Sequence, residues 1–218
     1  MFVGHYGPAF ALKPARKPIP LWVLFIAVQW LDICWTLLVL AGVEKLRVVP
    51  GFTEASPYDL YYMPFSHGLI GAVVLSALLG AVVAAVMREE RGRIFLVIAA
   101  AVFSHWLLDL LVHVPDLPLY DDSAKVGFGL WRSLWISLPL ELLVLVLGAW
   151  FYARAVPPRR RRGDLWLWAF VAFMVALHLY GTFGPLPTST SAVAQSGLGA
   201  YLVLALLAGL VDRARGTA

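Results

Sequence analysis

The chain has 218 residues, of which 61% are hydrophobic and 14% are charged, with a formal net charge of +4. This balance excludes a water-soluble domain of ordinary composition, so most of the chain must face lipid or other apolar segments. The single cysteine, Cys34, also excludes a disulfide framework and a thiolate metal cluster within one chain. Any metal site would therefore use histidine and carboxylate ligands.

Six apolar runs are long enough to cross a bilayer as helices, since a crossing needs about 20 mostly apolar residues. They cover residues 20–42, 66–87, 94–114, 130–153, 164–185 and 196–211. The fourth run contains Pro139 and the last run is short. The sequence therefore predicts an all-α membrane bundle of about six transmembrane helices.

The N-terminal segment is apolar over residues 2–12 and is followed by a basic, proline-rich stretch. It is either a re-entrant half-helix that pairs with the first span or a loose cytoplasmic tail. We do not expect a cleaved signal peptide, because a signal peptide carries its positive charge before its apolar stretch.

The whole chain, residues 1–218, is predicted to form one integral membrane domain, because no fixed repeat is present and the loops are short. Its parts are a half-helix and basic loop (1–19), a four-helix catalytic core (20–153), a basic cytoplasmic loop (154–163) and two additional helices (164–218).

Positive charge is distributed unevenly between the loops. Of the 17 Lys and Arg residues, thirteen lie in the N-terminal segment, in alternate loops or at the C-terminus: Lys13, Arg16, Lys17, Arg88, Arg91, Arg93, Arg154, Arg159 to Arg162, Arg213 and Arg215. Only Lys45, Arg47, Lys125 and Arg132 lie on the other side. The positive-inside rule then places both termini in the cytoplasm.

The run Arg159–Arg162 lies beside a span, where basic residues usually set topology and contact anionic lipid head groups. We therefore expect membrane lipid, and no nucleic acid, as a partner. Frequent Ala, Arg and Gly hint at a bacterial source, so the expected location is a bacterial inner membrane.

Ionisable side chains inside spans indicate functional sites, because each costs about 2.5–3.5 kcal/mol on insertion scales. This chain has several, among them Asp32, His67, His105, Asp109, Glu141 and His178. In the orientation given above, they lie from the middle of the membrane to its outer surface. A shared depth predicts one polar cavity that opens to the outer face.

The third span carries the most informative pair. His105 and Asp109 are one helical turn apart and can bind the same divalent ion. His113 and Asp116 continue the same helical stripe at i+8 and i+11. These two residues either contact substrate or are solvated at the outer interface.

His67 begins the second span, and we expect Ser66 to cap that helix. Gly68 and Gly71 are expected to allow close approach to a neighbouring helix.

Two more ligands are expected from the first part of the chain. Asp32, in the middle of the first span, is either a ligand, a carboxylate that holds a histidine tautomer, or a structural hydrogen-bond acceptor. The other is His5. If residues 2–12 contain a half-helix with Pro8 in its first turn, His5 lies just ahead of the N-terminus of that helix and reaches a depth similar to that of Asp32.

Glu141 shares a face of the fourth span with Ser133 and Ser137. Three roles are open for it: general base for an activated water, metal ligand, or buried protonated acid. His178, with Thr182 in the fifth span, is expected to be structural.

Four elements occur in an order that resembles a known family. They are Gly4-His5-Tyr6, Leu31-Asp32-Ile33, Phe65-Ser66-His67-Gly68, and Ser104-His105 through to Asp109. This set resembles the membrane-bound metal-dependent hydrolase family, which includes LexA-regulated inner-membrane proteins of bacteria. The resemblance covers roughly the first 130 residues and does not extend to the last two spans.

The resemblance implies a divalent metal held by His5, Asp32, His67, His105 and Asp109, and a hydrolytic reaction. Members of the family often carry PDxDH in the region of Asp32 and HRGxTH before the second helix. This chain departs from both patterns and lacks one histidine and one acid, so we expect one divalent ion, zinc in preference to manganese or magnesium.

Three functions are compatible with these patterns. The leading hypothesis is hydrolysis of an ester, phosphoester or amide, in a lipid or other small amphiphilic substrate, by water that a metal ion activates. In that case Glu141, His113 and Asp116 are the candidate catalytic residues. A transporter or channel for metal ions or protons is the second function, but it predicts polar groups in both halves of the membrane. The third is a scaffold whose polar residues only join helices. The sequence does not predict an oligomeric state.

Overall fold

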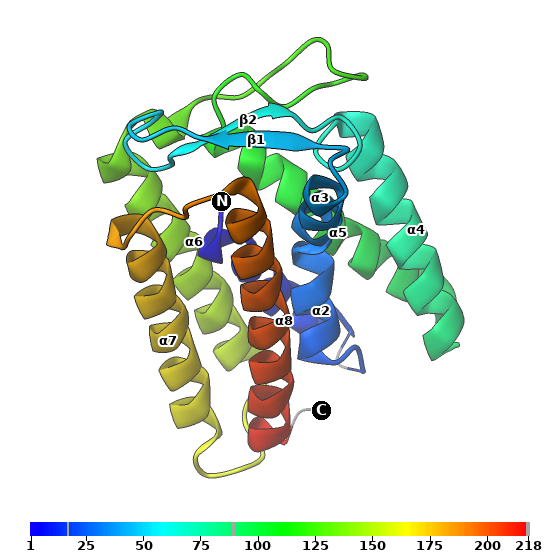
Figure 1. The fold of residues 1–218 in the computed structure, drawn as a ribbon. Coiled ribbons are helices and arrows are strands. Elements are labelled where there is room, and N and C mark those ends of the chain that lie inside the picture. The colour runs from blue at the N-terminus through cyan, green and yellow to red at the C-terminus, as the bar shows by residue number, and fades with distance from the viewer. Residues whose placement is uncertain (17, 89, 217–218) are drawn as a thin grey trace.

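The computed structural model describes residues 1–16, 18–88 and 90–216, and Lys17 of the predicted basic loop lies outside them. The fold is an all-α bundle with one small hairpin across one end (Figure 1). The α-helices are α1 (Tyr6–Leu12), α2 (Leu21–Val28), α3 (Trp30–Leu40), α4 (Leu69–Met87), α5 (Arg91–Val112), α6 (Leu134–Ala155), α7 (Gly163–Phe183) and α8 (Thr190–Arg215). Three short 3₁₀ helices accompany them: η1 (Val3–His5), η2 (Lys13–Arg16) and η3 (Leu130–Arg132).

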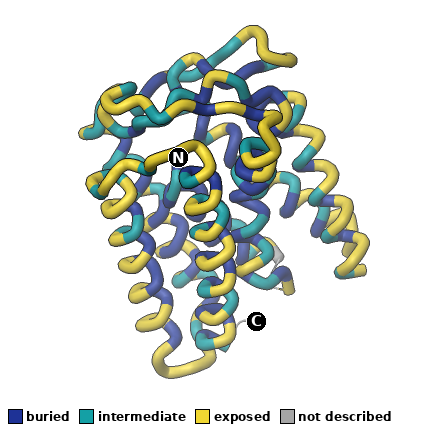
Figure 2. Tube along the Cα trace, in the orientation of Figure 1, coloured by how far each residue is buried: buried dark blue, intermediate teal, exposed yellow. Residues whose placement is uncertain are grey.

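Within the described part of the chain, five helices, α4 to α8, are long and apolar enough to cross a membrane, and α2 with α3 would make a sixth. Their outward faces carry large apolar side chains that are exposed, while the buried residues lie toward the middle of the bundle (Figure 2). This distribution is expected where lipid is the solvent of the outer surface. The predicted helical membrane bundle is therefore confirmed.

The first predicted span is not one straight helix. It is bent by 55° where α2 meets α3, and the break lies at Gln29. The Gln29 side chain donates a hydrogen bond to the Phe2 carbonyl, and a histidine from α5 bonds to the Val28 carbonyl at the end of α2. Side chains that enter a helix in this way produce sharp bends without proline or glycine.

The last predicted span was too short by several residues. α8 extends over 26 residues and begins at Thr190, where the Ser189 side chain accepts a hydrogen bond from the Ala192 backbone N–H. The polar residues Thr190, Ser191 and Ser196 lowered the hydropathy of this first part, although their hydroxyl groups are compatible with a helix.

The N-terminal segment forms a short helix that packs into the bundle, and it is not a loose tail. α1 packs against α6, α2 and α5, and Pro8 lies in its first turn. α1 approaches α6 very closely, because a Cβ atom at Gly7 would lie 2.4 Å from the Val144 carbonyl oxygen, and one at Gly148 would lie 2.2 Å from the Gly7 oxygen. Glycine at both positions thus allows the two backbones to touch.

α4 packs mainly against α5 and lies at one side of the bundle (Figure 1). Its buried face consists of four small residues at intervals of four, Ala72, Ser76, Gly80 and Ala84. Such a seam lets two helices approach without a hydrophobic driving force from water.

A two-stranded hairpin, which the sequence analysis did not predict, covers one end of the bundle (Figure 1). Strand β1 (Lys45–Val48) pairs antiparallel with β2 (Tyr58–Tyr62), and the loop of residues 114–129 lies nearby, where Lys125 Nζ donates to the Tyr61 carbonyl. We refer to the end that carries β1, β2 and residues 114–129 as the hairpin end.

A buried ion pair lies toward the opposite end of the bundle. Lys13 Nζ lies 2.8 Å from Asp212 Oδ2, and the same oxygen accepts the Leu21 backbone N–H. Tyr152 donates to Asp212 Oδ1 at 3.2 Å. The pair therefore joins η2 and the start of α2 to α6 and α8. Lys13 and Asp212 lie just outside the predicted spans 20–42 and 196–211, so the pair was not predicted from the sequence.

We expect Asp212→Asn to destabilise the bundle strongly, because it removes a carboxylate from a buried ammonium group. Breaking a buried pair by changing one partner typically costs about 3–5 kcal/mol. Equilibrium unfolding in mixed detergent micelles, followed by circular dichroism, measures the loss.

The matched control is Asp59→Asn, which breaks the Arg47–Asp59 pair on the hairpin, where the Arg47 side chain is 64% exposed. An exposed pair of this kind contributes about 1 kcal/mol or less. Equal losses in the two variants would contradict a structural role for the Lys13–Asp212 pair.

Candidate metal centre

Asp109 on α5 is the centre of a cluster of imidazole rings. Its Oδ1 atom lies 3.1 Å from His5 Nε2 and 3.6 Å from His113 Nε2. Its Oδ2 atom lies 3.0 Å from His105 Nε2 and 3.6 Å from His67 Nε2. All five side chains are buried. The structure thus brings together residues that are more than one hundred positions apart in the chain.

His105 is oriented by the break in the first span. Its Nδ1 atom lies 2.7 Å from the Val28 carbonyl oxygen, which ends α2. A carbonyl can only accept, so Nδ1 donates its hydrogen and the Nε2 lone pair points toward Asp109 and Asp32. This is the tautomer that a metal ligand requires.

His67 is oriented by a relay that begins at Glu44. The Glu44 carboxylate accepts the backbone N–H groups of Phe65 and Ser66, both at 2.8 Å, and the Ser66 hydroxyl at 2.5 Å. Since this hydroxyl donates to Glu44, it accepts from His67 Nδ1 at 2.8 Å. The His67 Nε2 lone pair then points toward Asp32, whose Oδ1 lies 3.3 Å away.

We expected Ser66 to cap the following helix, and this prediction is wrong. The N-cap of α4 is Gly68, and the Ser66 hydroxyl is occupied by Glu44 and His67. His67 accordingly lies in the turn before α4. Its carbonyl accepts a hydrogen bond from Trp106 Nε1 on α5, which fixes this turn against the third span.

Gly68 and Gly71 also differ in role from the prediction. A Cβ atom at Gly68 would lie 2.3 Å from the Pro64 oxygen, and one at Gly71 would lie 2.1 Å from the Phe65 oxygen. The two glycines therefore accommodate the chain's own turn at residues 64–67 rather than a neighbouring helix. Without side chains at these positions, the turn can fold back over the start of α4 and place His67.

The helical stripe on α5 ends earlier than predicted. α5 stops at Val112, and His113 is its C-cap in an extended conformation. His113 nevertheless faces Asp109, while its Nδ1 atom lies 2.9 Å from Asp116 Oδ1. Asp116 therefore holds a ring of the cluster, although it no longer belongs to the helix.

His5 contacts the cluster from the N-terminal segment. Its ring stacks on the His105 ring, with centroids 3.6 Å apart and planes inclined by 7°. Close parallel stacking suits neutral imidazole, which is the form that binds metals. Among the residues that the structure describes, His5 Nδ1 and Nε2 and His105 Nε2 are buried atoms without a hydrogen-bond partner.

Two groups of three side chains have a spacing that suits a metal ion. They are His5, His105 and Asp109, and Asp32, His67 and His105, with one ligand atom from each residue within 4.8 Å of the others. In the four histidine–aspartate pairs within these groups, the Nε2 atom and the carboxylate oxygen are 3.0 to 3.6 Å apart. Two ligands of one tetrahedral zinc ion, each at about 2.1 Å, are about 3.4 Å apart. Each group therefore has donor atoms and a spacing that suit a divalent ion.

Glu141 is buried beside the cluster and interacts with the N-terminal segment. Its Oε2 atom accepts the backbone N–H of Phe2 at 2.7 Å and that of Gly4 at 3.3 Å, and lies 3.9 Å from His178 Nε2. The Met1 amino group lies 2.5 Å from Asp109 Oδ1. Glu141 thus holds η1 against α6.

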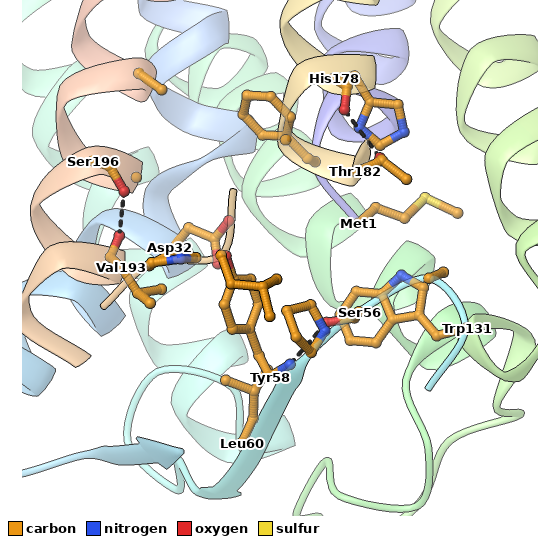
Figure 3. A pocket seen from close by; sticks show the side chains of 18 of the residues that line it. Met1, Asp32, Ser56, Tyr58, Leu60, Trp131, His178, Thr182, Val193 and Ser196 are labelled. Atoms are coloured by element: carbon orange, nitrogen blue, oxygen red, sulfur yellow. Dashed lines mark hydrogen bonds between the residues drawn. The ribbon is translucent and has the colours of Figure 1, made fainter. Parts of the chain in front are cut away.

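A cavity of about 610 Å³ reaches the cluster from the hairpin end. Asp32, His67, Asp109, His113 and Glu141 line its polar part. Figure 3 shows side chains from α8, β2, α7 and η3 around it, among them Ser196, Tyr58, His178 and Trp131. Tyr58 belongs to the hairpin, and its burial there raises the pKa of its hydroxyl.

Glu44 and the walls of the cavity were not predicted from the sequence. Glu44 is a lone acid between Val43 and Lys45, and no local pattern links it to Ser66, which lies 22 positions later. The only feature of the sequence that could have pointed to Glu44 is that an acidic residue closely follows the predicted span 20–42. The walls from α7 and α8 carry mostly apolar and small residues, which have no chemical signature of their own.

Comparisons with protein-family models, with curated proteins and with solved structures find no match for this chain. The family resemblance therefore remains an expectation from the residues.

Ser66→Ala is expected to weaken divalent-metal binding by about tenfold to a hundredfold, the usual effect of losing a group that orients a histidine ligand. The hydroxyl connects the Glu44 carboxylate to His67 Nδ1, and alanine breaks this connection without adding bulk. Competition with a fluorescent zinc chelator measures the affinity.

Ser76→Ala is the matched control. Ser76 is also buried, but its hydroxyl donates to the Ala72 carbonyl within α4 and not to the cluster. If both variants bind zinc with the same affinity as the original protein, Ser66 does not position His67.

Proposed function

We propose that this protein is an integral membrane hydrolase that depends on one divalent metal ion, zinc in preference to manganese or magnesium. The residues that would hold the ion are His5, Asp32, His67, His105 and Asp109. The bond that it cleaves is an ester, a phosphoester or an amide. We also propose that the chain is related to the membrane-bound metal-dependent hydrolases that its four sequence elements resemble.

One observation carries the proposal. His67 and His105 each use Nδ1 for a hydrogen bond that points away from the cluster, so both Nε2 atoms converge on the carboxylates of Asp109 and Asp32. Histidines in metal sites are held in this way by outer partners. The Asp109 side chain is buried and that of Asp32 is 14% exposed, so both carboxylates are stabilised by positive charge nearby, which a divalent ion would supply in addition to the Met1 amino group.

A bound divalent ion supplies Lewis acidity, which activates water and polarises the group under attack. The protein's own residues would do the rest. Glu141 lines the cavity and would accept a proton from the attacking water. His113, held by Asp116, lines the same cavity and would bind the substrate or transfer a proton to the leaving group.

The arrangement of the core favours an enzyme over a transporter. Between the cluster and the Lys13–Asp212 pair, the bundle is filled by packed aromatic rings: Tyr6 contacts Phe25, which contacts Phe10 and Phe170. Phe10 in turn stacks with Tyr152, which reaches Asp212. An ion pathway needs polar or hydrated groups along its length, whereas these rings separate the two polar regions.

For the location, we propose a bacterial inner membrane with both termini in the cytoplasm and the hairpin end outside, on the basis of the uneven Lys and Arg distribution. Cysteine labelling tests this topology in a Cys34→Ala background. A membrane-impermeant maleimide should label Lys125→Cys in intact cells and Arg160→Cys only after the membrane is disrupted. The opposite pattern would place the metal centre on the cytoplasmic side.

Elemental analysis of the detergent-purified protein tests the metal. We expect about one divalent ion per chain, as in a mononuclear catalytic site, and loss of that ion in His105→Ala and Asp109→Ala. His178→Ala is the control, because His178 lies on the cavity wall but belongs to neither of the two ligand groups. A protein without stoichiometric metal would overturn the proposal in favour of a scaffold, and variants that keep the metal would show that these residues do not hold it.

The same proteins test the reaction. Metal-loaded protein should hydrolyse at least one of three chromogenic probes, namely p-nitrophenyl butyrate, bis(p-nitrophenyl) phosphate and a p-nitroanilide. The rate should fall by about a hundredfold or more in His105→Ala, which corresponds to about 2.7 kcal/mol of transition-state stabilisation. A metal-loaded protein that hydrolyses none of these bonds would favour a metal-binding role without catalysis.

A further inference from the structure

The cavity continues beyond the polar cluster into an apolar region between the ends of α7 and α8. Its walls there include Phe2, Leu177, Val193 and Tyr201. At the outer edge they become small, since Gly181 lies on α7, and Ala192, Ser196 and Ala200 lie on α8. Small side chains on two facing helices leave a gap between them.

The gap opens where the surface is apolar. Tyr180 and Leu186 line the cavity and are 68% and 45% exposed, and the neighbouring Phe183 is 64% exposed. Large apolar side chains that are exposed at the end of a membrane-spanning helix contact the bilayer or its interface. A ligand can therefore enter this gap from the membrane.

We propose that the cavity binds an amphiphile with one linear apolar chain, taken up from the bilayer between α7 and α8. The chain would lie against Leu177, Val193 and Tyr201, and the polar group would reach Asp109 and His113. This inference rests on the proposed function for the fate of the polar group, but binding of the chain does not require the metal.

The volume of the cavity limits the size of the ligand that it can hold. Its volume of about 610 Å³ lies within the range of about 300–1,000 Å³ that holds a single drug-sized molecule. One chain with a compact polar group fits such a volume, whereas a whole two-chain lipid would leave part of its surface outside. The carboxylates that line the cavity, Asp32, Asp109 and Glu141, all lie in or beside the cluster, which orients the ligand with its polar group inward.

Photocrosslinking tests the inference without reference to catalysis. The protein is reconstituted in phosphatidylcholine vesicles with a trace of palmitoyl lysophosphatidylcholine that carries a diazirine at the end of its chain. We expect crosslinks on the cavity walls of α7 and α8, at or beside Leu177, Val193 and Tyr201. Mass spectrometry of the peptides locates them.

Gly181→Trp should reduce these crosslinks by about tenfold, a loss that corresponds to about 1.4 kcal/mol of binding free energy. Gly199→Trp is the matched control. No described atom lies within 4 Å of a Cβ placed at either glycine, so both positions have room for a side chain, but only Gly181 lines the cavity. Ser196→Trp, which fills the gap from α8, is a second variant that decides the question if Gly181→Trp does not fold.

Equal labelling of the Gly181→Trp and Gly199→Trp proteins, or crosslinks only on the lipid-facing sides of the helices, would overturn the inference. The His105→Ala protein separates this result from the proposed reaction, because it should be labelled like the original protein. A protein that holds metal but does not crosslink in the cavity would refute the amphiphile site alone. If the original protein crosslinks in the cavity but holds no metal, the hydrolase proposal alone is refuted.

Discussion

Four imidazole rings face the Asp109 carboxylate inside a largely apolar bundle, where a buried polar group without a partner costs free energy. Three irregular places in the fold supply partners for the outer nitrogen atoms. The break at Gln29 exposes the Val28 carbonyl to His105, the turn before α4 brings Ser66 and Glu44 to His67, and the end of α5 brings Asp116 to His113. The departures from regular helix are thus concentrated where the cluster needs them.

The two buried polar regions of the protein differ in a way that bears on function. At the Lys13–Asp212 pair, the carboxylate also accepts from Leu21 and Tyr152, so the charges compensate one another and join four segments. Around Asp109, both ring nitrogens of His5 and the Nε2 atom of His105 are buried and have no hydrogen-bond partner among the described residues. Native structures rarely leave buried polar atoms in this condition without a ligand or a catalytic role. The first region therefore stabilises the fold, and the second is the better candidate for chemistry.

The sequence predicted much of the cluster, because helical spacing is a local property. His105 and Asp109, one turn apart, lie on the same side of α5 whatever the rest of the chain does, and their Nε2 and Oδ2 atoms are indeed 3.0 Å apart. His5 and Asp32, the two further ligands expected from the first part of the chain, also lie beside this pair. Local reasoning failed for Ser66 and for the end of α5, where contacts with Glu44 and Asp116 override the expected cap and the expected continuation of the helix.

By itself, the sequence determined that this chain forms apolar helices and which of those helices carry ionisable groups, because hydropathy and helical period depend on near neighbours only. The tertiary structure decided the direction in which each imidazole points, since that depends on acceptors such as the Val28 carbonyl and Glu44 that lie far away in the chain. It also decided the bend at Gln29, the hairpin and the gap between α7 and α8. These features arise from contacts between distant segments, which no local pattern of residues encodes.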